Sequence, residues 1–516
     1  MSARKLLSRQ TVSQLAQTIG PATDCLLETQ LQQARALCYV YYSRSSSSSS
    51  ATSNQLLSNR FVEAGSTKNS PLFRSNPARY TATTAGSAAP TPFTVGPSSG
   101  GVPVGTNLKR DASTQAQQQI DLHQSVPKPY FSDTFRSSEL EIVRCSAGEL
   151  KPKPSTDKLL FGHTFTDHMF RVDWDTETGW STPLISKVHN IDIHPGAKVL
   201  HYALAAFEGA KAFRGYDNKI RLFRLDQNIK RLRRSARRLC LPDFDELELT
   251  KCIHRLIQLD QDWIPKTLGP NQLTSLYVRP TILGVDPSLG VAGSKQAILY
   301  VLLSPVGPYF KSGFKPVSLY ADPDVVRAWP GGAGSSKLGA NYAPTIMVQK
   351  QAEKLGLQQV LWLFGPDMKI TEVGTMNVFV SLRDPLTGKL HLITPPLTDG
   401  LILPGITRNS ILELANQWDD VVCEERYLTI DEIEQLIHEN RIVEMFGSGT
   451  ACVVCPINSI TLKGGRKLRI PHSDITHLSD SFEDEGPVLT KRILKAITDI
   501  QYGRVEHPWA AELSYD

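Results

Sequence analysis

A single lysine stands in a loop of small residues at positions 329–342, whose sequence is Trp-Pro-Gly-Gly-Ala-Gly-Ser-Ser-Lys-Leu-Gly-Ala-Asn-Tyr. The small neighbours of Lys337 leave room for a flat cofactor, and an amine in partly apolar surroundings can attack a carbonyl carbon. A phosphate-binding P-loop needs Gly directly before its lysine and Ser or Thr directly after it, whereas Ser336 precedes Lys337 and Leu338 follows it. Two interpretations remain, a lysine that forms a Schiff base and an ordinary surface lysine.

A carboxylate follows this loop, in the run Thr-Glu-Val-Gly-Thr-Met-Asn at residues 371–377. Glu372 lies between apolar residues on a strand-like segment, where an isolated carboxylate is costly unless it meets a cation. A protonated pyridine nitrogen is such a cation, and a carboxylate beside it keeps the ring an effective electron sink. The alternative is a salt-bridged residue on an edge strand, and the spacing alone favours neither.

Two glycine-containing turns supply backbone N–H groups further along the chain. The first, at residues 403–407, leads directly into a predicted helix, and a helix N-terminus favours phosphate. The second, at residues 446–451, follows a predicted strand and adds the hydroxyl of Thr450. Each turn alone is weak evidence, but together they predict a phosphate-binding cup.

The elements that must position these groups alternate between strands and helices from about residue 137 onward. Apolar spacing predicts helices at 226–239 and 246–259, and β-rich runs predict strands at 275–283 and 296–303. Beyond a segment rich in Pro and Gly at 304–314, we expect strands at 317–321, 359–364, 370–382 and 390–394, and helices at 344–355, at 407–418 and after a capping box at 429–432. The pattern predicts two α/β domains, at 137–303 and 317–510, with a linker at 304–316 and a cleft between them.

The basic residues of the 516-residue chain are concentrated at its N-terminus. Residues 1–110 carry 11 basic against 3 acidic side chains, a charge of +8, and the remainder carries 45 against 48, a charge of −3. The Arg-rich, Ser-rich and acid-poor start predicts a mitochondrial presequence over residues 1–44, with a basic disordered tail as the alternative. Residues 45–136 have a low-complexity composition and are predicted to be mostly disordered. No run approaches the ~18 apolar residues that cross a bilayer, and eight scattered cysteines argue against a disulfide scaffold.

Taken together, the motifs resemble those of a known enzyme family. They are Lys337-Leu-Gly-Ala-Asn-Tyr342, Thr371-Glu-Val-Gly-Thr-Met-Asn377, Leu403-Pro-Gly-Ile-Thr-Arg408 and Phe446-Gly-Ser-Gly-Thr-Ala-Cys-Val-Val-Cys-Pro456. In this order they resemble the motifs of branched-chain amino-acid aminotransferases, pyridoxal-phosphate enzymes of fold type IV. Upstream motifs such as Phe-Glu-Gly at 207–209 extend the resemblance over residues 137–510.

The resemblance implies a two-domain α/β (α+β) fold, with pyridoxal 5′-phosphate in the interdomain cleft and held mainly by the larger, C-terminal domain. The implied reaction is a ping-pong transfer of the amino group between Leu, Ile or Val and 2-oxoglutarate, in branched-chain amino-acid biosynthesis or catabolism. A homodimer is expected, with no nucleic acid, metal or membrane anchor as partner. The predicted presequence indicates the mitochondrial matrix, with the cytoplasm as the alternative.

Position by position, Lys337 resembles the lysine that forms the Schiff base and moves the proton between the substrate Cα and the cofactor C4′. Glu372 resembles the carboxylate that faces the pyridine nitrogen, and Tyr342 resembles the phenol that hydrogen-bonds the 3′-oxygen. The resemblance assigns the phosphate to Arg231, Thr450 and the backbone N–H groups of Ile406 and Thr407. The helix around Arg231 carries five further basic residues, and by charge alone it is a solvated face or a nucleic-acid-binding stripe.

The resemblance also assigns a substrate pocket. Its residues are Phe161, Tyr202, Phe207, Tyr277, Thr375 and Ala451. Arg279 resembles the arginine that helps the pocket accept a second carboxylate, which 2-oxoglutarate requires. Tyr202, Leu289 and Val291 resemble residues that reach the site of the other subunit.

Cys452 and Cys455 form a Cys-x-x-Cys pair directly after the second glycine-containing turn. A structural zinc site needs two further ligands at suitable spacing, and none is near in the sequence, so zinc is not expected. In some animal members of the family such a pair acts as a redox switch. The alternative is two small buried residues packed beside a turn.

Other functions fit parts of the sequence. D-amino-acid aminotransferases and aminodeoxychorismate lyase share the fold type, but Phe-Thr-Asp-His at 165–168 and the segment at 449–455 favour the branched-chain group. A catalytically inactive scaffold and a nucleic-acid binder are disfavoured by the intact Lys337 and Glu372 and by the −3 charge of residues 111–516.

Overall fold

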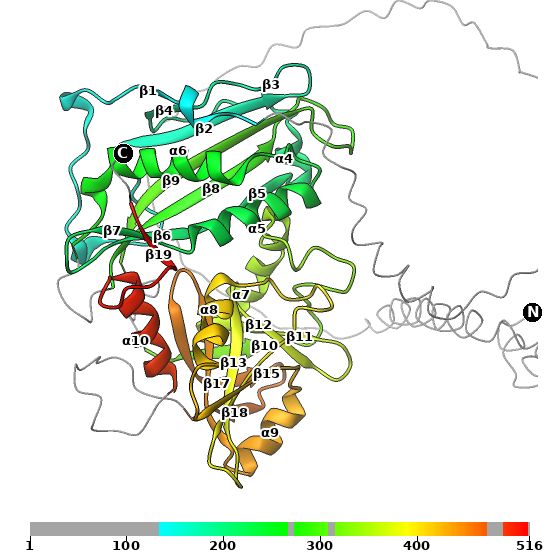
Figure 1. Ribbon diagram of the computed structural model, residues 1–516. Helices are drawn as coiled ribbons and strands as arrows, with labels where there is room; N and C mark the ends of the chain where they lie inside the picture. The colour runs from blue at the N-terminus through cyan, green and yellow to red at the C-terminus, as the bar shows by residue number, and fades with distance from the viewer. Residues whose placement is uncertain (1–133, 267–272, 308–314, 472–488, 514–516) are drawn as a thin grey trace, which may run out of the picture. The chain divides into compact units, whose positions relative to one another are not determined.

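The computed structural model describes residues 134–266, 273–307, 315–471 and 489–513. The predicted presequence at 1–44 and residues 45–133 of the predicted arm lie outside the described residues. The described residues belong to one compact unit, in which their elements build two β-sheets (Figure 1). The boundaries between two domains therefore stay a prediction.

Within the described residues, the first sheet has ten strands and is mostly antiparallel. They are β1 (Glu141–Ile142), β2 (His168–Asp175), β3 (Gly179–Trp180), β4 (Leu184–Lys187), β5 (Ala205–Phe207), β6 (Ala210–Arg214), β7 (Ile220–Phe223), β8 (Ser275–Gly284), β9 (Gln296–Val306) and β19 (Ala510–Glu512). Their order is β1-β4-β2-β9-β8-β6-β7-β19, with β3 beside β2 and β5 beside β8. The short helix α4 (Lys198–Tyr202) leads into β5.

Two longer helices, α5 (Leu225–Arg238) and α6 (Glu246–Leu259), pack on this sheet (Figure 1). Helix α6 begins where the side chain of Asp245 accepts hydrogen bonds from the N–H groups of Leu247 and Glu248, at 2.8 and 3.0 Å. Its apolar residues recur at helical spacing and are buried against the sheet. Both predicted helices are confirmed, with α5 shifted by one residue.

The second sheet has nine strands among the described residues. They are β10 (Val317–Ala321), β11 (Gln359–Phe364), β12 (Lys369–Val373), β13 (Met376–Arg383), β14 (Leu390–Thr394), β15 (Val421–Glu425), β16 (Ile442–Gly449), β17 (Val453–Leu462) and β18 (Lys467–Arg469). Because β12 pairs with both β11 and β13, the strands β12-β11-β10-β17-β16-β13 close into a six-stranded barrel. Glu372 on β12 therefore does not lie on an edge strand.

Strand β13 shows how the sequence builds this barrel. Its alternate residues Val378, Val380 and Leu382 join an apolar cluster to which all six barrel strands contribute. Phe379 points to the opposite face and stacks on Phe446, with ring centroids 5.2 Å apart. Because the strand is buried on both faces, its central residues Val378–Val380 are apolar without alternation.

Four helices surround the barrel: α7 (Thr345–Lys354), α8 (Ile406–Ala415), α9 (Ile430–His438) and α10 (Leu489–Gln501). A third apolar cluster contains Phe213 and Phe223 of the first sheet together with Ile411 of α8 and Ile497 of α10. This cluster joins the two sheets, and it fixes α8 to the barrel and to the first sheet.

Three predicted elements differ in the structure. The helix predicted at 407–418 is α8, which ends at Ala415. The strand predicted at 370–382 is a hairpin, in which β12 ends at Val373 and β13 begins at Met376. The chain turns at Gly374, which has a φ of 56°, and a Cβ there would lie 1.9 Å from Gln359 Oε1. The linker predicted from residue 304 begins later, because β9 continues to Val306 by pairing with β8.

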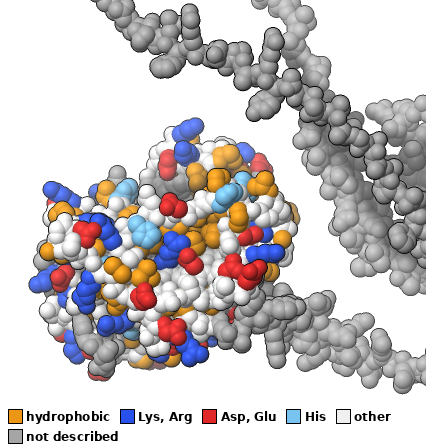
Figure 2. All heavy atoms as spheres, turned by 90° about the horizontal axis from the view of Figure 1, so that it is seen from above, with side chains coloured by type: hydrophobic (Ala, Val, Ile, Leu, Met, Phe, Trp, Pro, Cys, Tyr) orange, Lys and Arg blue, Asp and Glu red, His pale blue; other side chains and the backbone are white. Residues whose placement is uncertain are grey.

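Figure 2 views the molecule from the side of β1–β4 in Figure 1. On this face basic and acidic side chains are interspersed, with apolar side chains between them, and no uniformly basic field forms there. Within the part of the chain that the structure describes, no helix combines the length and the apolar character that a membrane span requires.

Candidate active site

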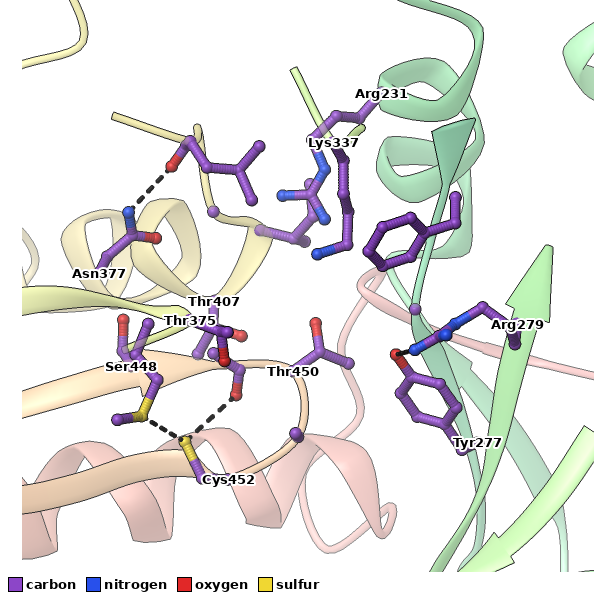
Figure 3. Close-up of a pocket in the computed structure, with 18 of the residues that line it drawn as sticks. Arg231, Tyr277, Arg279, Lys337, Thr375, Asn377, Thr407, Ser448, Thr450 and Cys452 are labelled. Atoms are coloured by element: carbon purple, nitrogen blue, oxygen red, sulfur yellow. Dashed lines mark hydrogen bonds between the residues drawn. The ribbon is translucent and has the colours of Figure 1, made fainter. Parts of the chain in front are cut away.

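One cavity of about 340 Å³ brings together residues from the first sheet, the barrel, α5 and α8. In Figure 3, Arg231 and Lys337 extend toward the same space, with Thr407 and Thr450 across it and Tyr277 and Arg279 to one side. The predicted site residues that line it are Phe161, Phe207, Arg231, Tyr277, Arg279, Lys337, Tyr342, Thr375, Ile406, Thr407, Thr450, Ala451 and Cys452. Glu372 lines a smaller adjoining cavity, which shares Tyr342, Thr375 and Asn377 with the first.

Lys337 is held by both of its backbone groups. Its N–H donates to Ser235 Oγ on α5 at 2.9 Å, and its carbonyl accepts from the N–H of Phe207 on β5 at 3.2 Å. The amine Nζ donates to Tyr342 Oη at 3.1 Å and lies 4.9 Å from the centre of the Phe207 ring. The backbone anchors therefore aim the amine into the cavity, where it faces a phenol and an aromatic ring.

Glu372 is 3% exposed, and its carboxylate has partners on two sides. One oxygen accepts from the backbone N–H of Leu403 at 2.8 Å, and the other lies 3.0 Å from Arg327 Nε. Burial raises the pKa of Glu372, and the charge of Arg327 opposes that rise. The ion pair that was the alternative for Glu372 is present, with Arg327 as the cation, although β12 is not an edge strand. The contact of Glu372 with a pyridine nitrogen stays a prediction.

The phosphate end of the cavity combines α5 with the start of α8. Gly405 is the N-cap of α8, so the N–H groups of Ile406 and Thr407 have no partner within the helix. Arg231 reaches this end from α5 and donates to Pro404 O at 2.8 Å. Its other nitrogens contact both oxygens of Glu208, at 2.5 and 2.9 Å. Burial alone would lower the pKa of Arg231, but the charge of Glu208 raises it above its usual value.

The opposite end of the cavity is lined by aromatic side chains and by one cation, Arg279. Phe161 packs edge-on against Tyr277, with ring centroids 4.8 Å apart. Arg279 donates from Nη2 to Tyr277 Oη at 3.0 Å, and its guanidinium lies 4.8 Å from the centre of the Phe207 ring. Arg279 Nε is buried and has no hydrogen-bond partner among the described residues. This end can surround an apolar side chain and still offer a donor to a carboxylate.

Several predicted residues do not line the cavity. Tyr202 donates its hydroxyl to the carbonyl of Leu289, away from the lining, while Leu289 and Val291 are 66% and 84% exposed. Cys455 is buried in the barrel cluster, and Cys452 touches both that cluster and the cavity, with its Sγ 3.3 Å from Met376 Sδ. Burial raises the pKa of the Cys452 thiol to about 12.

Sequence reasoning missed three charged residues at the site, namely Glu208, Arg327 and Lys211. Lys211 on β6 is 7% exposed and donates to the carbonyl of Ala451 at 2.8 Å. Burial lowers the pKa of Lys211 to about 8. Glu208 and Lys211 could have been noticed in the sequence, because they are charged residues in the otherwise apolar segment that forms β5 and β6. The loop around Arg327 has no such pattern.

Comparison with known proteins shows the class of protein to which the chain belongs. Residues 205–460 match the family model of amino-transferase class IV, a span that contains the lysine loop, Glu372 and most of the cavity. The chain is also similar in fold to the branched-chain aminotransferase of Thermoproteus uzoniensis with norvaline, at a TM-score of 0.51 and 23% identity over 66% of this chain and 99% of that one. A branched-chain amino acid aminotransferase of Escherichia coli gives a TM-score of 0.51 at 24% identity, with the same coverage.

Closer relatives define the family within that class. The cytosolic branched-chain-amino-acid aminotransferase of Mus musculus is 52% identical over 383 residues, which cover 74% of this chain and 94% of the relative. The mitochondrial branched-chain-amino-acid aminotransferase of Bos taurus is 47% identical over 408 residues, covering 77% and 99%. The chain therefore belongs to the branched-chain-amino-acid aminotransferase family and is a transferase of that class.

The family implies pyridoxal 5′-phosphate, and the cavity fits this group. Arg231, two hydroxyls and the free N–H groups of α8 are donors suited to a phosphate, and Lys337 offers an amine to an aldehyde. The cavity wall contains Ser448, whose buried Oγ has no hydrogen-bond partner among the described residues. The cavity wall is also closely packed at Gly405, because a Cβ there would lie 2.0 Å from Asn377 Oδ1.

Proposed function

We propose that this protein transfers the amino group between Leu, Ile or Val and 2-oxoglutarate by a ping-pong mechanism, with pyridoxal 5′-phosphate bound to Lys337. The observation that carries the proposal is the backbone-anchored Lys337 amine, directed into a cavity with phosphate donors at one end and aromatic walls at the other. When bound, the cofactor supplies a protonated ring that accepts the electrons of a bond at the substrate Cα.

The residues of this chain bind, orient and move protons. Lys337 Nζ would carry a proton between the substrate Cα and C4′ of the cofactor. Tyr342, whose Oη accepts from Lys337 Nζ at 3.1 Å, would bind the cofactor through its 3′-oxygen. The carboxylate of Glu372 would keep the ring nitrogen protonated, while Arg231, Ile406, Thr407 and Thr450 would hold the phosphate.

The substrate end supports branched aliphatic side chains. Phe161, Phe207 and Tyr277 provide apolar walls, and one methylene group more or less in such a pocket changes binding by only ~1–3 kcal/mol. All three branched-chain amino acids should therefore react. Arg279 would bind the second carboxylate of 2-oxoglutarate, because its side chain lines the aromatic end of the cavity and carries a positive charge.

The proposal extends to the assembly and the compartment. Leu289 and Val291 are large apolar residues that are 66% and 84% exposed, which supports a second subunit packed over the loop that Tyr202 contacts. The mitochondrial matrix is proposed from the +8 charge of residues 1–110, with the cytoplasm as the alternative, since the relatives include both mitochondrial and cytosolic proteins.

The test is a panel of amino-acid donors with 2-oxoglutarate, read beside the visible absorbance of the bound cofactor. We expect L-Leu, L-Ile and L-Val to react within about 200-fold of one another, as hydrophobic-pocket discrimination allows. A preference for D-amino acids, or the formation of pyruvate from aminodeoxychorismate, would contradict the proposal and favour another enzyme of the same fold type. The Lys337→Ala variant is the control for background turnover.

A further inference from the structure

A second cavity, of about 510 Å³, lies on the other side of the phosphate end. It shares Arg231, Gly405 and Ile406 with the first cavity, so the two meet where α5 faces the start of α8. The basic residues that line it are Lys230, Arg231, Arg233, Arg234, Arg237 and Arg408. We refer to this second cavity as the basic groove.

The charges of the basic groove are only partly compensated. Arg231 is paired with Glu208, Arg408 with Glu425, and Arg233 and Arg237 with Asp243. Carboxylates of the protein therefore balance part of the charge of these four arginines, and Glu246, which pairs with Arg233, also lines the groove.

Two cations of the groove remain. Lys230 and Arg234 have no carboxylate within ion-pair distance among the described residues, and Arg234 donates only to the carbonyl of Ser335, at 3.0 Å. Partial burial and the neighbouring charge of Arg231 lower the pKa of Arg234. The negative charge of a bound anion would oppose both effects on the pKa of Arg234.

Arg408 adds charge to the groove but no donor that a ligand could reach. It lines the groove and is 2% exposed, and its Nε is enclosed by the protein. The donors that a ligand can reach are the exposed side chains of Lys230 and Arg234. Phosphate oxygens are suitable acceptors for both.

We propose that the basic groove is a second phosphate-monoester site, which binds the phosphorylated cofactor on its way into and out of the first cavity. The proposal rests on the proposed function, because it takes the phosphate end of the first cavity as the place of the bound cofactor. Lys230 and Arg234 attract the phosphate at the outer end, and Arg231 borders both cavities. Five of the six basic residues of α5 line the groove, so a phosphate site explains them without a nucleic acid.

The experiment uses the full-chain holoenzyme, loaded with one equivalent of cofactor, and measures further binding of labelled pyridoxamine 5′-phosphate by equilibrium dialysis. We expect a second, weaker and salt-sensitive equivalent. The Lys230→Ala/Arg234→Ala variant should lose about tenfold or more of this second affinity and exchange bound cofactor more slowly, with the first equivalent unchanged. The matched control is Arg238→Ala/Arg255→Ala, which removes the same charge from positions outside the groove and should behave like the unchanged protein.

Three results would overturn the proposal. They are the absence of a second equivalent, equal losses in the two double variants, and equally tight binding of pyridoxamine, which has no phosphate. Inorganic phosphate that binds as tightly as pyridoxamine 5′-phosphate would reject the cofactor as the ligand. Failure of the proposed function is distinct, because the protein would then not take up the first equivalent.

Discussion

Arg327 Nε lies 3.0 Å from Glu372 Oε2, and both side chains are almost completely buried, with 8% and 4% of their surfaces exposed. The backbone N–H of Leu403 donates to the other oxygen of the same carboxylate at 2.8 Å. Glu372 is therefore fixed in position by the protein alone, before any ligand contributes. A buried carboxylate held in this way is prepared to stay ionised beside a second cation.

Replacing Arg327 by Met should destabilise the protein strongly. The change leaves Glu372 buried without its cation, and such losses cost about 3–5 kcal/mol. The pKa of Glu372, which burial already raises, should rise further because the charge that opposes the rise is gone. Thermal unfolding measures the effect, and the control is Arg426→Met, which breaks a surface pair with Glu432 that is worth less than about 1 kcal/mol. Equal melting temperatures for the two variants would show that the buried pair adds no stability.

The Glu372→Gln variant should be less stable, because Arg327 loses its negative partner, and the folded protein should bind cofactor but lose activity. The amide oxygen can still accept from the N–H of Leu403, whereas the negative charge beside the ring nitrogen is lost. Removal of such a preorganised electrostatic contact lowers kcat by roughly 10²-fold or more. The measurement is kcat per bound cofactor, and an unchanged value would remove Glu372 from the ring nitrogen.

Lys211 should make the stability of the protein depend on pH. Its pKa in the folded state is about 8, below the usual 10.5, so unfolding takes up a proton between these pH values. Stability should therefore rise with pH across this window, by roughly 3 kcal/mol relative to Lys211→Met. Melting temperatures between pH 7.5 and 10.5 measure how stability changes with pH, and Lys251→Met is the surface control. If the melting temperatures of Lys211→Met and the unchanged protein changed in parallel with pH, the prediction would be contradicted.

The Cys452 thiol should react slowly at neutral pH. With a pKa of about 12, roughly one molecule in ten thousand carries the thiolate at pH 8, and the thiolate is the reactive form. Iodoacetamide followed by peptide mapping should label the exposed Cys240 before Cys452. Peroxide should accordingly leave turnover unchanged, whereas a rapid loss that a thiol reductant reverses would support the redox switch.

The chemistry-bearing motifs of the sequence were informative because each needs an unusual combination of residues. The glycine- and serine-rich loop around Lys337 and the turn before Ile406 both line the predicted site. Strands and helices with clear periodicity, such as α6 and β11, also have the predicted bounds. These features depend on neighbours in the sequence, and local patterns therefore predict them.

The features of the fold and the site that the sequence did not predict depend on contacts between residues far apart in the sequence. Nothing local links Arg327 to Glu372, or Glu208 to Arg231, because these pairs form only when the two sheets are built. The hairpin at Gly374 was missed because only Gly374 and Thr375 separate β12 from β13, and apolar residues continue on both sides of this short turn. Barrel closure itself leaves no signal in the sequence of a single strand.

The most direct test of the account is to reduce the cofactor-loaded protein with borohydride and map the peptides by mass spectrometry. Lys337 should carry the mass of the reduced cofactor, and Lys337→Ala should lose both the label and transamination. Lys211 is the informative rival, because it is a buried lysine with a pKa of about 8 and donates to the carbonyl of Ala451, in the wall of the same cavity. A label on Lys211, or undiminished turnover by Lys337→Ala, would contradict the account.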